Sequence, residues 1–91
     1  GIRASTEPYA QLGAQTIRAR LATHWGIAET GASGPSGNPY GDAAGHSCIA
    51  VSGPLERSIT LETGRSDRVD NMWLFTEAAL TLFVECLTDA R

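Results

Sequence analysis

The spacing of apolar and polar residues predicts a helix near the start of the chain. Ser5 and Thr6 offer capping hydroxyls, and Pro8 suits the first turn of a helix. The expected helix runs to about His24, with polar residues on one side and one apolar stripe on the other. That stripe consists of Tyr9, Leu12, Ile17 and Leu21.

Three short segments then predict strands. Residues 25–30 open with an apolar run, and residues 47–52 have a continuous apolar centre that indicates burial on both faces. Residues 57–63 alternate apolar and polar side chains, which is typical of a half-buried strand. The Gly53-Pro54 turn between the second and third segments favours an antiparallel hairpin.

The last helix is expected to start with Ser66 or Asp67 as its cap. Further apolar side chains lie outside its main stripe, so more than one neighbour is expected to cover this helix. One side is expected to pack on the sheet, and the outer side, with Leu74 and Leu82 at its edge, on another chain segment or another copy. The main stripe has regular helical spacing and consists of Val69, Trp73, Thr76, Leu80, Phe83 and Leu87.

The order helix, strand, loop, strand, strand, helix predicts a layered α/β unit. A parallel or mixed sheet of only three strands leaves its edges and faces open, so the unit looks incomplete. The chain lacks an initiating methionine, which suggests processing, cleavage or a deliberate cut, and its start has no apolar region typical of a signal peptide.

Composition narrows the possible functions. The 91 residues suffice for one small domain with a net charge of −3, and all seven basic residues are arginines that form no run. Nucleic acid is therefore not an expected partner. No segment approaches the roughly 18 apolar residues that span a bilayer, so no membrane association is expected. Two cysteines fit a reducing compartment, which predicts a cytoplasmic protein.

A glycine-rich loop at residues 31–45 joins the first two expected strands. It contains two prolines, at positions 35 and 39, and its glycines permit close approach of the backbone to another group. The loop is neither a Walker A motif nor a dinucleotide-binding fingerprint. It can hold an anion such as a nucleotide phosphate on its backbone amides, or it can be an ordinary surface crossover.

His46 and Cys48 lie two apart at a strand start, so both side chains face the same side. The pair could form a nucleophile or part of a metal site, but two ligands are too few for a metal. A loop-end histidine and a buried cysteine are the simpler interpretation. We expect no metal and no cofactor. Arg65 and Arg68 stand beside acidic residues and can either form ion pairs or reach an anionic ligand.

Residues 25–35 read Trp-Gly-Ile-Ala-Glu-Thr-Gly-Ala-Ser-Gly-Pro, followed by Gly45 and by Ile-Ala-Val at 49–51. This pattern resembles the CinA C-terminal domain family, also called the nicotinamide-nucleotide amidohydrolase family. The Thr-Gly-x-x-Gly-Pro motif is fairly specific in this strand–loop–strand context. The order of the helices and the Asp67-Arg68 start of the last helix also match, so the resemblance covers nearly the whole chain.

The resemblance implies a three-layer α/β/α domain with a mixed sheet that hydrolyses the amide of nicotinamide mononucleotide (NMN) without a metal. It places five residues in the substrate pocket: Thr30, Gly31, Gly34, Pro35 and Arg68. The family's nucleophilic serine lies in a Glu-Ser-x-Thr-Gly-Gly turn, followed by a tyrosine and a lysine. None of these is present here, so no catalytic residue is assigned to this chain.

Residues 1–91 are therefore expected to form the second half of such a domain, with a nucleotide-like small molecule as ligand. The expected macromolecular partner is the upstream half, further copies of the chain, or both. A binding or interaction module that retains the fold without catalysis is the alternative. A structural unit that forms oligomers through the apolar last helix is a third possibility.

Overall fold

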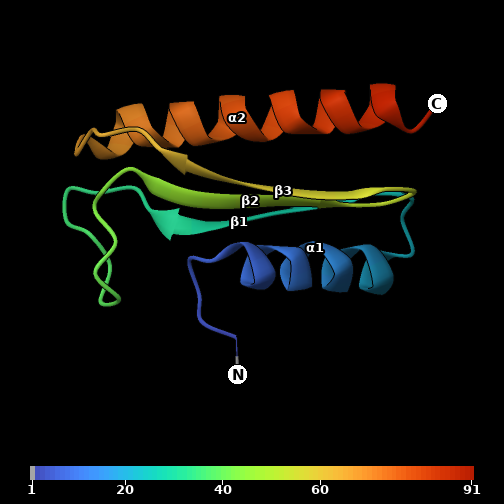
Figure 1. Ribbon diagram of the computed structural model, residues 1–91, viewed down its shortest axis with the longest axis horizontal. Coiled ribbons are helices and arrows are strands. Elements are labelled where there is room, and N and C mark those ends of the chain that lie inside the picture. The colour runs from blue at the N-terminus through green and yellow to red at the C-terminus, as the bar shows by residue number, and fades with distance from the viewer. Residues whose placement is uncertain (1) are drawn as a thin grey trace.

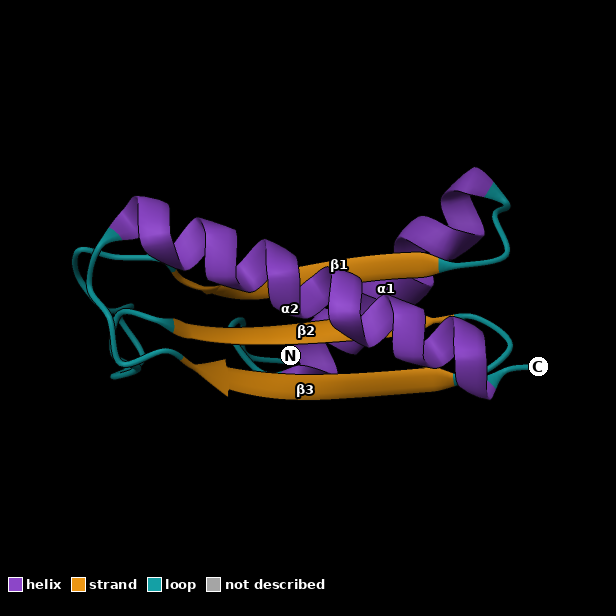
Figure 2. Cartoon of the chain, turned by 90° about the horizontal axis from the view of Figure 1, so that it is seen from above, coloured by secondary structure: helices purple, strands orange, loops and turns teal. Residues whose placement is uncertain are grey.

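The structure is a computed structural model that describes residues 2–91, and it has a sheet between two helices (Figure 1). In Figure 2 the second helix runs diagonally over the sheet, starting above β1 and ending above β3. The elements in chain order are α1 (Glu7–Leu21), β1 (Gly26–Ala32), β2 (His46–Ser52), β3 (Glu56–Glu62) and α2 (Arg68–Asp89).

The sheet has the strand order β1-β2-β3, and both pairings are antiparallel. Cys48 in β2 lies opposite Thr30 in β1 and Thr60 in β3, which fixes the register. The predicted α/β class, with helices on both faces of a sheet, and the predicted hairpin are confirmed. All three described strands are antiparallel, so a mixed sheet requires strands from outside this chain.

The central strand separates two small cores, and all seven of its residues are buried. Toward α1, Cys48 and Ala50 pack with alanines of the helix. Toward α2, Ile49 and Val51 pack with residues of that helix that include Leu82. The expected burial of this strand on both faces is confirmed, because successive side chains point to opposite faces of a sheet.

The predicted apolar stripe of α1 faces outward, although an amphipathic helix ordinarily turns its apolar stripe toward the core. Ala10 and Ala14 face the sheet. The sheet surface beneath α1 is rich in small and hydroxyl side chains, and Glu7 accepts hydrogen bonds from Ser58 (2.7 Å) and Thr60 (2.5 Å) there. Large apolar side chains would not fit this close, partly polar contact. The exposed side chains are Tyr9, Leu12, Ile17 and Leu21.

The ends of both helices follow local chemistry. Thr6 caps α1 by accepting from the backbone of Tyr9, and Asp67 caps α2 by accepting from the backbone of Asp70. Asp67 is one of the two residues expected for that cap. The first helix ends at Leu21, three residues before the expected end, because Ala22 adopts a left-handed conformation.

The predicted stripe of α2 also faces outward for most of its length, which corrects its expected packing. Trp73 is 72% exposed and Leu80 is 58% exposed, whereas Leu82 is 2% exposed. Leu82 thus lies in the core, not at the edge of an outer side as expected. The buried residues of α2 are Asn71, Phe75, Leu82 and Cys86.

Cys48 and Cys86 are both free and buried. They belong to the two different cores, so the sheet separates them. Within residues 2–91, neither helix combines the length and the apolar character that crossing a membrane requires.

Candidate functional site

The loop between β1 and β2 packs against the segment that leads into α2. Gly34 and Gly45 both have positive φ, at +104° and +95°. A side chain at Gly34 would clash with the backbone of Ser66, and one at Gly45 with the hydroxyl of Thr63. Glycine is therefore required at both positions, by conformation and by space. The loop is therefore packed against the segment before α2 at these two glycines.

Asn71 at the start of α2 holds the loop in place. Its side chain is fully buried, and its Nδ2 donates to the carbonyl oxygens of Ser33 (2.9 Å) and Arg65 (2.8 Å). Its Oδ1 accepts from the hydroxyl of Thr63 at 2.5 Å. A buried amide with this many partners fixes the position of each segment that it contacts.

A cavity of about 480 Å³ lies between the end of β1 and the first half of α2. Gly31 forms part of its wall, and a side chain there would clash with the carbonyl oxygen of His46. The guanidinium of Arg68 stands at the same cavity and donates to the carbonyl oxygen of Gly34 at 3.4 Å. The volume is typical of small-molecule sites. The remaining wall residues are Glu29, Ser33, Met72, Phe75, Thr76, Ala79 and Leu80.

The five predicted pocket residues fall into separate places. Gly31 and Arg68 line the cavity, and Gly34 adjoins it through its hydrogen bond with Arg68. Pro35 is exposed and lies outside the cavity wall. Thr30 faces the opposite side of the sheet, because neighbouring residues of a strand point to opposite faces.

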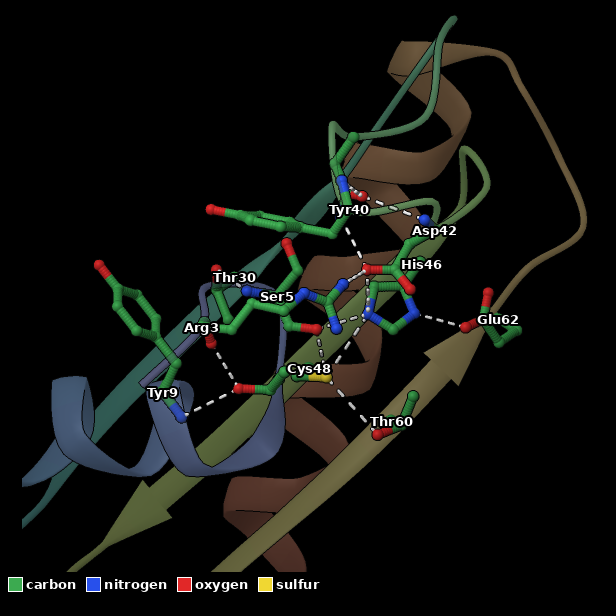
Figure 3. A network of polar contacts seen from close by, with 12 residues as sticks. Arg3, Ser5, Tyr9, Thr30, Tyr40, Asp42, His46, Cys48, Thr60 and Glu62 are labelled. Carbon is green, nitrogen blue, oxygen red and sulfur yellow. Dashed lines mark hydrogen bonds and ion pairs between the residues drawn. The ribbon is translucent and has the colours of Figure 1, made fainter. Parts of the chain in front are cut away.

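On that opposite side, Thr30 belongs to a polar network around His46 (Figure 3). The hydroxyl of Thr30 accepts from the backbone nitrogen of Ser5 at 3.0 Å. The carbonyl oxygen of Ser5 lies 2.7 Å from Nε2 of His46, and Nδ1 of the same ring contacts the carboxylate of Glu62. Asp42 lies 3.6 Å from Nε2. The network thus ties the segment before α1, the loop, β2 and β3 together.

Both ring nitrogens of His46 face acceptors, which a neutral imidazole cannot satisfy at the same time. Burial opposes protonation of the ring. The hydrogen bonds to Glu62 and Ser5 and the negative charges of Asp42 and Glu62 outweigh it, so the pKa of His46 is raised above its ordinary value. The geometry therefore indicates a buried imidazolium that joins several chain segments.

Cys48 lies beside this ring, with its sulfur 3.8 Å from Nε2 of His46 and 3.5 Å from the carbonyl oxygen of Ser5. Burial raises the pKa of the Cys48 thiol. A cysteine nucleophile reacts as a thiolate, which this environment disfavours. The geometry supports a structural role for both residues. Within residues 2–91, no group of three or more His, Cys, Asp or Glu side chains is arranged to hold a metal ion.

A comparison with family models matches residues 2–87 to the CinA C-terminal domain. The chain belongs to the CinA C-terminal domain family. A curated "CinA-like protein" from Gloeobacter violaceus is 39% identical over 83 residues, which is 87% of this chain and 19% of that protein. The match confirms the family that the Thr-Gly-x-x-Gly-Pro motif indicated.

The fold is also that of a solved structure, a competence-damaged protein (CinA) superfamily protein from Enterobacter cloacae. The TM-score is 0.77 at 25% identity, and the match covers 96% of this chain and 50% of that chain. The present chain thus spans half of this solved CinA relative and a smaller share of the curated one.

Two polar groups near the cavity escaped the sequence analysis of this CinA-family chain. Glu29 in β1 lines the cavity, and burial raises the pKa of its carboxyl. The hydroxyl of Ser47, opposite Gly31 in the sheet, is buried and has no hydrogen-bond partner among the described residues. Strand alternation places both on the α2 side of the sheet, so their facing could be predicted. The burial of Ser47 could not, and Glu29 is exposed.

Proposed function

We propose that this chain supplies the substrate-binding part of an NMN amidohydrolase-type site, with the cavity at β1 and α2 as the pocket. The supporting observation is the place of Arg68. Its guanidinium stands at the start of α2, where the helix dipole also favours an anion. Arginine binds phosphate through several parallel donors. The phosphate of NMN is the group that Arg68 would hold.

Arg68 has donors to spare for such a ligand. Among residues 2–91 its side chain has one hydrogen bond, to the carbonyl oxygen of Gly34, and it belongs to none of the ion pairs there. Arg65, by contrast, lies 3.6 Å from the carboxylate of Asp70. Of the two roles considered for these arginines, ion pairing therefore suits Arg65 and ligand binding suits Arg68.

The nucleophile is proposed to come from another part of the domain, because the sequence has neither the family's serine motif nor any lysine. The resemblance implies hydrolysis without a metal or cofactor. The 91-residue chain alone is then expected to release no ammonia from NMN. The free state of both cysteines suits the proposed cytoplasmic location.

A binding module without catalysis is the second candidate. The cavity suits a binding module as well as an amidohydrolase, and the absence of the serine motif from residues 1–91 is common to both candidates. Ammonia release by the full-length protein that contains this chain separates the two candidates. Binding of NMN without release supports the module, and release supports the amidohydrolase.

Binding itself is tested with Arg68→Ala in the full-length protein, by calorimetric titration with NMN. Loss of a charge-assisted hydrogen bond costs about 1.5–3 kcal/mol, which weakens binding roughly 10- to 150-fold. Thermal stability should be nearly unchanged because Arg68 is exposed. Arg65→Ala is the matched control and should bind like the parent. Equal NMN affinity in parent and Arg68→Ala would contradict the proposed site.

A further inference from the structure

A second cavity, of about 550 Å³, lies on the other side of α2, between this helix and β3. Figure 2 shows how it arises: α2 crosses the sheet diagonally from β1 to β3, so the first half of the helix leaves the end of β3 uncovered. The floor includes Ile59 and Leu61, which lie two residues apart on β3 and therefore share its α2 face. The apolar part of the helix wall consists of Leu74, Ala78 and Leu82.

This second cavity lies along an open edge of the sheet. β3 is the last strand in the order, and among residues 2–91 its outer edge pairs with no other strand. Such an edge offers backbone N–H and C=O groups to a further strand. On the opposite face of β3, Thr60 already donates to Glu7, so the open apolar surface is on the α2 face. A strand edge beside a helix-lined apolar groove is suited to an extended peptide that adds a strand to the sheet.

The rim of this groove on α2 is acidic. Glu77 and Glu85 are exposed, with Thr81 between them on the same flank of the helix, and neither glutamate belongs to an ion pair among residues 2–91. The basic residue of the wall, Arg65, lies 3.6 Å from the carboxylate of Asp70. The two glutamates therefore favour an occupant with positive charge.

A second copy of the chain fits this edge poorly. Two β3 strands paired about a twofold axis at Ile59 would place Glu56 of each strand opposite Glu62 of the other. Like charges directly opposite one another destabilise a strand pair. The acidic rims of the two copies would also face each other across the axis. The charge pattern therefore favours a basic segment of a different protein.

We propose that the groove between β3 and α2 binds an extended basic peptide of a partner protein, which adds to β3 as a further strand. Glu77 and Glu85 are eight residues apart, which is about 12 Å along a helix, and four residues of a strand span about 13 Å. The two glutamates therefore match two basic side chains four residues apart on one face of the peptide. The side chain midway between them faces the apolar floor, so the pattern is basic-x-apolar-x-basic. This site is separate from the cavity at β1 and does not depend on the proposed function.

The test is fluorescence anisotropy of the full-length protein with the labelled, end-blocked peptide Thr-Arg-Thr-Ile-Thr-Arg-Thr. A peptide of the same composition, Arg-Arg-Thr-Ile-Thr-Thr-Thr, places its arginines on opposite faces and should bind more weakly. The double variant Glu77→Gln, Glu85→Gln should bind the first peptide about 4- to 25-fold more weakly, since each exposed ion pair contributes a factor of about two to five. Glu29→Gln, outside the groove, is the matched control and should bind like the parent. Both glutamates of the groove are exposed, so the melting midpoint should be unchanged in the double variant.

Hydrogen exchange tests the added strand itself. The β3 amides that point away from β2 should exchange rapidly in the free full-length protein and slowly in the peptide complex. Protection of these amides before peptide is added would show that the protein's own chain or a second copy occupies the edge, and would overturn the proposal. Failure of the first peptide to bind, or equal binding of the two peptides or of the parent and the double variant, would overturn it as well.

Discussion

The orientation of α2 can be tested with two leucines that lie two residues apart. Leu82 is 2% exposed and packs with Ile49, Val51 and Cys86, whereas Leu80 is 58% exposed. Leu82→Ala would leave a cavity in this core and should lower the free energy of unfolding by about 2–5 kcal/mol. Leu80→Ala should lower it by about 1 kcal/mol or less, because the side chain is already more than half exposed.

Thermal unfolding followed by circular dichroism measures both variants. For a domain of this size, each kcal/mol shifts the midpoint by about 4–8 °C, so Leu82→Ala should melt at least about 8 °C below the parent. Work at low protein concentration removes any contribution from association through Leu80. Equal shifts, or a larger shift for Leu80→Ala, would refute the orientation and restore the stripe that the sequence predicts as inward.

Two further outcomes are expected. His46→Gln should be less stable than the parent, most of all below about pH 6.5, the ordinary histidine pKa. Because the folded-state pKa of His46 is raised, its stabilisation is complete below the unfolded value and is lost as the pH rises through the folded value, so melting midpoints of the two proteins should converge with increasing pH. Glutamate at both Leu80 and Val84, which are exposed neighbours on α2, should release monomer from an associated parent in sedimentation without unfolding it. A parent already monomeric at high concentration would rule out self-association through this face.

The sequence predicts the elements well because their signals are local. Each signal acts within a few residues of the feature that it predicts. The capping aspartate predicts the start of α2 at Asp67, the Gly-Pro turn predicts the β2–β3 hairpin, and the apolar centre of the second strand predicts the burial of β2. Which side of α2 faces inward is not a local property. The predicted stripe and the buried residues of α2 both have helical spacing. Which of the two sets packs on β2 depends on how the helix is placed against the whole sheet.

The site is predictable in part for the same reason. Of the residues that the resemblance assigns, Gly31 and Arg68 line one cavity and Gly34 adjoins it, but strand alternation sends Thr30 to the other face. Asn71 and Glu29 were not assigned to the site. Asn71 matters because it is buried and Glu29 because it lines the cavity, and both properties depend on segments that are distant in sequence.

One residue connects the two faces of the sheet. The carbonyl oxygen of His46 occupies the space where a side chain at position 31 would lie, so its backbone fixes the shape of the cavity wall. Its ring holds Ser5 and Glu62 on the opposite face. Glycine at position 31 therefore lets β1 approach the backbone of β2 at the cavity, and histidine at position 46 anchors β2 on the opposite face.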